Sequence, residues 1–477
     1  MLRMLGLALA LTTVTTVTAV TAAEGTPTRI PERAIPIAEA LRDKALAGTQ
    51  AFDIVEDLTT TVGPRLPGSE ADARAVAWAV AKFRALGFDR VWTEPVTIPV
   101  WRRGHERAEV VGAFAQPLVI TALGGSVGTD GVLEAEIVEF PNLQALREAP
   151  EGSLEGKIAF VSNRMERFID GRGYGPAVVA RSNGAVEAAR LGARAIVIRS
   201  ISTNSARFPH TGNMRYADGV PKIPAAALSN PDADQLLRLL ARGQPVRLRL
   251  DFEAGTVGEY TTHNVIGEIT GRERPDEVVV IGAHLDSWDL GTGALDDGAG
   301  VAITMAAGAL IGQLDQAQRP RRSVRVIAWG AEEIGLLGAY AYAARHADAI
   351  DRHLIGAESD FGAGRIYALR AGVKDSAWEA IERIGQVLAP LGIVTERGKG
   401  GPGPDIIPLA QRGMAWAQLA QDGSDYFDYH HTPDDTLDKI DPQALDQQVA
   451  AYAAFAYLAA EAEGDFGSAP REAVQNR

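Results

Sequence analysis

Residues 282 to 300 concentrate side chains that bind metals or move protons. This stretch, GAHLDSWDLGTGALDDGAG, holds His284 and four aspartates among five glycines. Carboxylates this close together repel one another unless a cation lies among them. A second acidic pair, Glu332 and Glu333, directly follows the apolar run SVRVIAWGA and meets the same problem. The two clusters together predict a metal site.

The available ligand types restrict the metal. The 477-residue chain has no cysteine, so a metal must be held by His, Asp and Glu. Imidazole with carboxylate suits Zn²⁺ and admits Mn²⁺ or Co²⁺, whereas Ca²⁺ and Mg²⁺ favour oxygen ligands alone. Two histidines with at least three carboxylates exceed the three protein ligands of one catalytic zinc. We therefore expect two metals, about 3.5–4 Å apart, that share a bridging carboxylate and polarise a water or hydroxide between them.

The fold of the C-terminal half must bring these ligands together. From Thr262 onward, strand-like runs alternate with helix-like segments, which predicts a mostly parallel α/β sheet with helices on both faces. The predicted strands cover 277–287, 323–333 and 353–362, and the predicted helices cover 298–314, 335–347, 375–392 and 441–463. Functional residues collect at the carboxyl ends of such strands. The candidates lie at the ends of predicted strands or in the loops after them, with His431 in the loop after the strand-like run 414–420: His284, Asp286, Asp296, Asp297, Glu332, Glu333, Asp360 and His431.

The rest of the chain divides into further segments. Helices are predicted at 37–58 and 70–86, with strands at 90–101 and 108–115. From about 116 to 255, short strands and glycine turns predict an inserted β-rich domain. The expected division is a signal peptide (1–23), the N-terminal part of the domain with the candidate metal site (24–115), the inserted domain (116–255), the main part of the metal-site domain (256–465) and a flexible tail (466–477).

The N-terminal segment predicts export. It carries Arg3, then an apolar core, then small residues around Ala22 and Ala23, a pattern typical of a cleaved signal peptide. A membrane anchor is the alternative, but threonines dilute the run and it is short for a span. We expect a secreted or periplasmic protein without a stable anchor. The net charge of −14 argues against a nucleic-acid partner.

Five motifs, taken in order, resemble a known family: HLDS, GALDDGAG, WGAEEIGLLGA, ESD and HHTPDDT. With these intervals they resemble the secreted co-catalytic dizinc exopeptidases related to bacterial leucyl aminopeptidase. The resemblance covers the whole mature chain, because RSNGAVEAARLGARAIVIRS and PHTGNMRY are similar to the inserted segment of one subgroup. It implies that 256–465 is the main part of a zinc peptidase domain and that the inserted domain is of the protease-associated type. It also implies a homodimer, which no residue pattern tests.

The resemblance implies a ligand set of five residues. His284 and Asp360 would hold one zinc, Glu333 and His431 would hold the other, and Asp296 would bridge them. All of these residue types are present, so the resemblance implies an intact site.

Two catalytic roles follow from the same resemblance. Asp286 would orient the His284 imidazole, a support that metal-bound histidines commonly need. Glu332 would be the general base, which takes a proton from the attacking water and passes it to the leaving amine.

Two ligand assignments have close competitors in the sequence. Asp296 is preferred to Asp297 as the bridge because the family places its bridging acid four residues before the glycine that is Gly300 here. His431 is preferred to His430 because the family's ligand directly precedes a hydroxyl residue.

Substrate contacts are expected from loops 400–409 and 421–430. The candidates for a substrate amine or carboxylate are Asp405, Asp422, Ser424, Tyr426 and His430. The alternative is that they are turn formers and solvated acids. Arg65 and His210 are interpreted as capping or packing residues.

The function that follows is hydrolysis of peptide bonds in dipeptides and short peptides, by dipeptidase or carboxypeptidase action. An aminopeptidase on the same fold is the first alternative. A single-zinc cyclotransferase is a second, and an inactive receptor-like binding ectodomain is an alternative of another class. Broken ligands would indicate the ectodomain, and the chain shows none.

Overall fold

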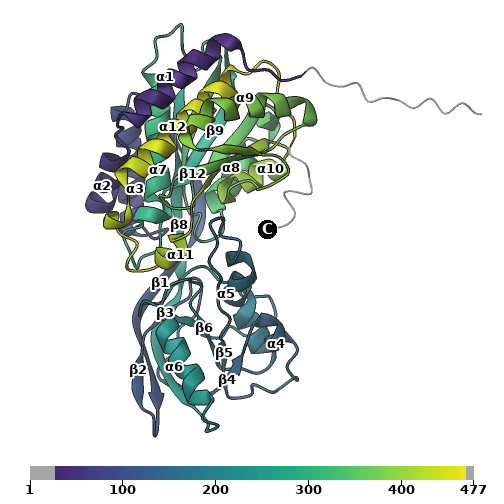
Figure 1. Cartoon of the computed structure of the whole chain (residues 1–477). Helices are drawn as coiled ribbons and strands as arrows, with labels where there is room; N and C mark the ends of the chain where they lie inside the picture. Colours follow the sequence, from purple (N-terminus) through teal and green to yellow (C-terminus); the bar gives the residue numbers. More distant parts are fainter. Residues whose placement is uncertain (1–26, 469–477) are drawn as a thin grey trace, which may run out of the picture.

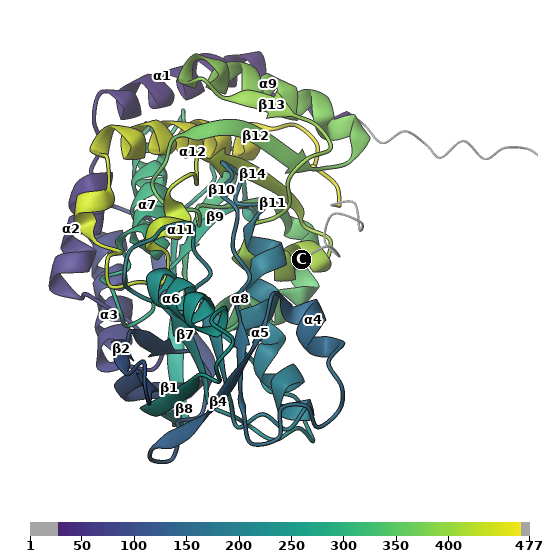
Figure 2. The ribbon, with the colours of Figure 1, turned by 60° about the horizontal axis from the view of Figure 1, so that its bottom comes forward.

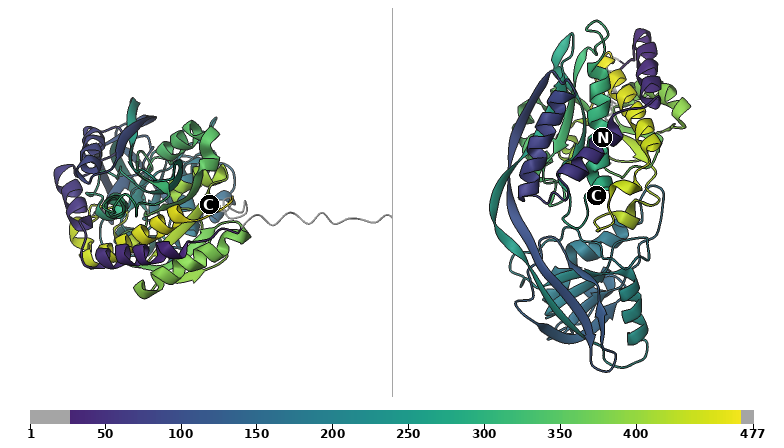
Figure 3. Two further views of the ribbon diagram at one scale, coloured as in Figure 1. Left: turned by 90° about the horizontal axis from the view of Figure 1, so that it is seen from above. Right: turned by 90° about the vertical axis from the view of Figure 1, so that its left-hand side faces the viewer.

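Two bodies, joined by a pair of long antiparallel strands, make up the chain (Figure 1). The structure, a computed structural model, describes residues 27–468. β1 (Arg90–Val111) pairs with β8 (Arg247–Ile269) along nearly its whole length. Figure 3 shows this ribbon running along one side of both bodies. The predicted signal peptide, and the predicted tail beyond residue 468, lie outside the described residues.

The larger body is built on a mostly parallel sheet. Its strand order is β13-β12-β14-β11-β9-β10-β8, and β1 pairs with β8. Strands β10, β9, β11 and β14 are mutually parallel, which confirms the predicted sheet. The strand bounds are β9 (Arg274–His284), β10 (Arg322–Trp329), β11 (His353–Glu358), β12 (Ile366–Gly372), β13 (Val394–Glu396) and β14 (Ala415–Gln421).

Helices cover both faces of this sheet. One face carries α1 (Ile35–Leu46), α2 (Ala51–Thr61), α3 (Glu70–Ala85), α7 (Ala299–Gly312), α9 (Trp378–Leu388) and α12 (Pro442–Glu461). The opposite face carries α8 (Leu337–Arg345) and α10 (Ile407–Gln411). Short 3₁₀ turns link these elements at Glu32–Ala34, Ala347–Arg352, Asp375–Ala377, Ala389–Leu391, Pro404–Ile406 and Leu437–Lys439.

α7 is apolar on all sides because it lies inside the core. Every residue from Ala299 to Ile311 is buried. Within residues 27–468, segment 294–312 alone has the length and composition of a membrane span, and 94% of its most apolar window is buried in the protein. A helix buried on all sides reads as apolar whether protein or lipid surrounds it. Here the surroundings are the sheet, α2 and α12.

The predicted helix over 37–58 is wrong in one respect, since it is two helices. Gly48, at φ 125°, lies between α1 and α2 and turns the chain in a region that favours glycine. The Thr49 amide and hydroxyl then donate to Asp446 Oδ1 of α12, at 2.9 and 2.6 Å. This side-chain contact is 397 residues distant in sequence, so local periodicity could not indicate it.

The smaller body contains strands β2 to β7 and helices α4 to α6. β4 pairs with β8, so its sheet, ordered β4-β5-β6-β7-β3, continues that of the larger body. α4 and α5 pack on one face, and α6 packs on the other. Strand β8 continues through residue 255, where the C-terminal boundary of the inserted domain is predicted. That boundary stays a prediction. The bounds are β2 (Gln116–Leu118), β3 (Ile120–Ala122), β4 (Leu133–Phe140), α4 (Leu143–Arg147), β5 (Ile158–Val161), α5 (Tyr174–Arg190), β6 (Ala195–Arg199), β7 (Ala225–Leu228) and α6 (Asn230–Leu240).

We predict that Gly300→Ala destabilises the protein. A Cβ added at Gly300, in the first turn of α7, would lie 1.9 Å from the Ser359 carbonyl and 2.3 Å from Asp297 Oδ1. Relieving such a clash in a packed core typically costs about 1–3 kcal/mol. The matched control is Gly258→Ala at an exposed position of β8, where an added Cβ meets no atom within 4 Å. Chemical denaturation measures both, and equal stability of the two variants would contradict the prediction.

Candidate active site

The predicted ligands lie at one edge of the larger sheet. His284 ends β9, Glu333 follows β10, and Asp360 follows β11. His431 follows β14 by way of α11 (Tyr426–Tyr429), which lies where the two bodies meet (Figures 1 and 2). Because these four strands are parallel, their carboxyl ends lie together.

Asp296 stands between the two histidines. Its Oδ1 lies 3.0 Å from His284 Nε2, and its Oδ2 lies 3.1 Å from His431 Nε2. Each histidine also has a second acid: Asp360 Oδ1 is 3.6 Å from His284 Nε2, and Glu333 Oε2 is 3.0 Å from His431 Nε2. The five residues therefore form two ligand groups that share one carboxylate.

This arrangement fits a pair of metal ions. All five side chains are nine-tenths or more buried. Asp296 Oδ2 and Glu333 Oε1 accept no hydrogen bond from the residues that the structure describes. Buried carboxylate oxygens without partners are costly, and a cation removes that cost. The donors are imidazole and carboxylate, a combination that suits zinc.

The competing residues have other contacts. Asp297 Oδ2 accepts the His284 amide at 3.0 Å, and its Oδ1 accepts the Gly300 amide at 3.2 Å. His430 Nε2 lies 3.6 Å from Asp296 Oδ2, and its ring stacks on His431 with centroids 3.5 Å apart. His431 Nε2 faces two acids, Asp296 and Glu333, whereas His430 Nε2 faces Asp296 alone, so the contacts with acids favour His431. His430 is nevertheless close enough to Asp296 and His431 for a metal to bind all three.

Asp286 positions both halves of the site. His284 Nδ1 donates to the main-chain carbonyl of Asp286 at 2.9 Å, whereas the nearest Asp286 carboxylate oxygen is 3.9 Å away. The carboxylate instead accepts the amides of Glu332 and Glu333, at 3.0 and 3.2 Å. Ala331, at φ 60°, turns the chain just before these amides. The ring is thus oriented by the main-chain carbonyl of Asp286, and its Nε2 is left free to bind a metal.

Asp435 supports the bridging residue, and the sequence did not single it out. Its carboxylate accepts the amides of Leu295 and Asp296, at 2.6 and 3.2 Å. The Asp296–Asp297 peptide bond beside it is cis. Burial, with the charge of Asp296, raises the pKa of Asp435 to about 7. Its place four residues after His431, in the motif HHTPDDT, was the available signal.

Arg65 holds the loop of residues 285–295, which connects His284 to Asp296. Its guanidinium is fully buried and donates to the carbonyls of Leu285 (2.5 Å), Thr292 (2.6 Å) and Gly293 (2.9 Å). These carbonyls lie at both ends of the loop that connects His284 to Asp296. Burial lowers the pKa of Arg65, while the charges of the nearby aspartates raise it. Arg65 is therefore a packing residue, as expected, and also a buried cation beneath the acids.

The smaller body reaches the site through residues 210 and 211. His431 Nδ1 donates to the Thr211 carbonyl at 3.2 Å, which leaves Nε2 facing Asp296 and Glu333. His210 Nδ1 contacts the His430 carbonyl at 2.7 Å. His210 is thus a buried packing residue, as interpreted, but it lies beside the site.

The charges of the cluster shift the pKa values of its members. Burial lowers the pKa of His431, but Glu333 and Asp296 outweigh burial and raise it to about 9. The pKa of His284 also rises, because Asp296 and Asp360 outweigh its burial. Burial raises the pKa of Glu332, as do the neighbouring acids Asp360 and Glu333.

The predicted substrate residues fall into three groups. Tyr426 and His430 lie together beside the ligands, with ring centroids 5.1 Å apart. Asp422 Oδ1 instead accepts the amide and hydroxyl of Ser424, which is the turn-forming alternative. Asp405 is fully buried, and its amide donates to Glu358 at 2.9 Å.

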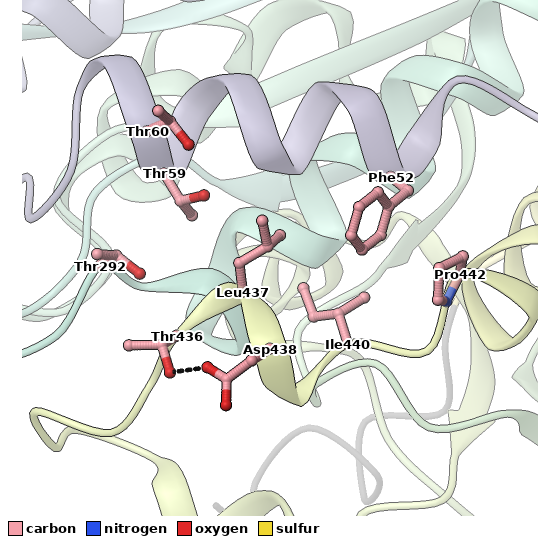
Figure 4. Close-up of a pocket in the computed structure, with 9 residues that line it drawn as sticks. All are labelled: Phe52, Thr59, Thr60, Thr292, Thr436, Leu437, Asp438, Ile440 and Pro442. Carbon is pink, nitrogen blue, oxygen red and sulfur yellow. Dashed lines mark hydrogen bonds between the residues drawn. The ribbon is translucent and has the colours of Figure 1, made fainter.

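A large pocket lies next to the loop of residues 285–295 but away from the predicted ligands. It has a volume of about 540 Å³ and is lined by Phe52, Thr59, Thr60, Thr292, Thr436, Leu437, Asp438, Ile440 and Pro442 (Figure 4). Its carboxylate, Asp438, already accepts from Thr436 and Lys439, so it offers no free metal ligand. A much smaller pocket opens on Asp296, Glu333 and His431.

The sequence and the structure match known peptidases. Residues 264–456 match the model of peptidase family M28. Human carboxypeptidase Q is 36% identical over 434 residues, which cover 90% of this chain and 89% of that protein. The crystal structure of a peptidase M28 precursor from Shewanella amazonensis matches with a TM-score of 0.89 and 51% identity, over 92% of this chain and 99% of that one. A zinc aminopeptidase from Bacillus subtilis matches with a TM-score of 0.60 and 21% identity, over 85% and 94%, which shows the shared fold.

We predict that zinc stabilises the protein through Asp296. A ligand that binds only the folded state adds about 2.7 kcal/mol when its concentration is 100 times Kd. Chelation should therefore lower the melting temperature, and added zinc should restore it. Asp296→Asn should weaken this response, whereas the exposed control Asp315→Asn should keep it. Scanning calorimetry tests both, and a full zinc response in Asp296→Asn would contradict the assignment.

Zinc binding should release protons and weaken as the pH falls. With a pKa near 9, the His431 ring is protonated at pH 7.5 in the metal-free protein, and the raised pKa of His284 favours its protonated form. A metal must displace these protons, because it binds neutral imidazole. Calorimetric titration in buffers of different ionisation enthalpy counts the released protons. The prediction would be contradicted if zinc binding released no protons at pH 7.5, or if zinc bound more tightly at pH 6 than at pH 7.5.

Proposed function

The chain belongs to peptidase family M28 and is a metallopeptidase, and on that premise we propose that it is an exported dizinc exopeptidase. Its proposed substrates are dipeptides and short peptides, cleaved by dipeptidase or carboxypeptidase action. The observation that carries the proposal is the carboxylate of Asp296, whose two oxygens face two different histidines. Each histidine is completed by its own acid, so a dinuclear centre accounts for every ligand.

The ligand geometry supports a definite division of labour. His284 and Asp360 would hold one zinc, Glu333 and His431 would hold the other, and Asp296 would bridge them. Bound zinc would supply Lewis-acid chemistry, lowering the pKa of a coordinated water and polarising the scissile carbonyl. The protein keeps both imidazoles in the tautomer with a free Nε2, through the carbonyls of Asp286 and Thr211.

Glu332 is the proposed general base. Its amide donates to Asp286, and its carboxylate accepts no hydrogen bond from the residues that the structure describes, which leaves the carboxylate free for a water. Burial and the acids around it raise its pKa, which makes the carboxylate a better proton acceptor. Glu332 would take a proton from the attacking water and return it to the leaving amine. Its neighbour Glu333 serves as a ligand, so the pair divides the two tasks.

The relatives support a direction for the cleavage. The relative with 36% identity is named a carboxypeptidase, and the chain covers nearly all of it. The aminopeptidase from Bacillus subtilis shares the fold at lower identity. We therefore prefer dipeptidase or carboxypeptidase action, with aminopeptidase action as the alternative. The signal-like segment 1–23 and the precursor form of the Shewanella relative support secretion or export to the periplasm.

We predict that Glu332→Gln abolishes most of the activity without removing the metal. The amide cannot accept the proton, and positioned general bases typically contribute about 10²–10⁴-fold to the rate. Dipeptide hydrolysis measures the loss, and elemental analysis measures zinc per chain. The exposed control Glu259→Gln should retain wild-type activity. Hydrolysis at the wild-type rate by Glu332→Gln with two zincs bound would overturn the assignment of the base. A wild-type protein with neither zinc nor activity would favour the binding ectodomain.

A further inference from the structure

Arg181 on α5 is a buried cation without a counter-ion among residues 27–468. Only 6% of it is exposed. Its Nη1 donates to the Thr211 carbonyl at 3.3 Å, and its Nη2 donates to the Tyr174 hydroxyl at 2.5 Å. Its Nε has no partner in the described chain. Burying an arginine in this state is costly, so the position calls for an explanation.

The other buried arginines of the described chain are satisfied. Arg42, Arg199 and Arg322 each pair with a carboxylate, at 2.8, 2.7 and 2.5 Å. Arg65 uses all three of its nitrogens on main-chain carbonyls. Arg181 alone among them combines a missing ion pair with an unpartnered nitrogen. Among the buried arginines of the described chain, the lack of both an ion pair and a partner for one nitrogen is therefore particular to Arg181.

Arg181 lies directly beside the metal site. The Thr211 carbonyl that it contacts also accepts from His431 Nδ1. A Cβ added at Gly212 would lie 2.3 Å from Arg181 Nη1 and 2.7 Å from His431 Nδ1. The guanidinium and the imidazole therefore lie on either side of Gly212. The guanidinium thus comes from the smaller body and stands at the junction with the ligands of the larger body.

Other unpartnered nitrogens mark the same junction. His430 Nδ1 and His210 Nε2 are buried without hydrogen-bond partners in the described residues. His210 contacts the His430 carbonyl, and the Tyr174 ring that carries the Arg181 contact lies edge-on to His430 at 5.6 Å. Buried polar atoms normally have partners, so three such side chains in one region indicate a place where a polar ligand binds.

We propose that Arg181 binds the C-terminal carboxylate of the peptide substrate. A planar guanidinium matches a carboxylate with two parallel hydrogen bonds, and the substrate would supply the counter-ion that the chain lacks. This inference rests on the proposed peptidase function and deepens it, because it explains a preference for peptides with a free C-terminus. The smaller body would then contribute specificity while the larger body carries the metal ligands.

The test compares matched substrates in Arg181→Met and wild-type protein. The substrates are Ala-Ala, its C-terminal amide, and Ala-Glu amide, whose only carboxylate is in the side chain. We expect wild type to prefer Ala-Ala, and Arg181→Met to lose about 10- to 150-fold in kcat/KM on Ala-Ala, the factor that corresponds to a charge-assisted hydrogen bond. Both amides should change less than threefold. The control Arg190→Met, exposed on the same helix, should behave as wild type.

The readouts separate binding from support of the metal site. If Arg181 only fixes Thr211 and His431, the variant will lose activity equally on acid and amide and will bind zinc more weakly, which overturns the proposal. A loss confined to Ala-Glu amide overturns it as well. Wild-type cleavage of acid and amide at equal rates removes this inference and leaves the peptidase function standing, whereas no cleavage of any peptide removes both. If Arg181→Met does not fold, Arg181→Lys is assayed instead, and an unchanged acid-to-amide ratio in that variant counts against the proposal.

Discussion

The positions of the other residues in the site depend on the contact of the buried Asp296 carboxylate with the imidazoles of His284 and His431. Asp296 must present one oxygen to His284 and the other to His431, so both rings and the loop between them need fixed positions. Asp435 fixes the main chain of Asp296, Asp297 fixes the amide of His284, and Arg65 fixes the two ends of the loop. Asp435, Asp297 and Arg65 are all buried, and they form these hydrogen bonds with main-chain groups. The side chains of the proposed metal ligands are therefore left available.

Electrostatics explains why the supports are themselves charged. The site buries several carboxylates, and the pKa values of Asp297, Glu332 and Asp405 rise because burial and neighbouring acids disfavour their charged forms. The pKa of Asp296 is instead held well below its usual value, because His284 and His431 outweigh its burial. Arg65 offsets part of this charge from beneath. The imidazoles of His284 and His431 offset more, which is why their pKa values rise in spite of burial. A pair of dications would replace those protons and complete the balance.

The two bodies form one functional unit. The larger body supplies every proposed metal ligand from the carboxyl ends of its parallel strands. The smaller body supplies the Thr211 carbonyl that orients His431, and it places Arg181 beside that ring. The continuous β1–β8 ribbon ties the bodies together, so the position of residue 211 depends on strands that begin in the catalytic sheet. Changes in the smaller body are therefore expected to alter the site.

The sequence by itself determined the fold class and the candidate ligands, because strand and helix periodicity are local and the ends of parallel strands must meet. The fold class is confirmed, and the five ligands converge, although their metal-binding roles and the domain boundaries stay predictions. Only the tertiary structure decided which groups support them: Arg65 meets the Leu285 carbonyl across 220 residues, and His431 meets Thr211 across the same separation. Such contacts join side chains to main-chain carbonyls, which every residue possesses, so residue type and spacing carry no signal for them. They exist because packing places one backbone group within reach of one side chain.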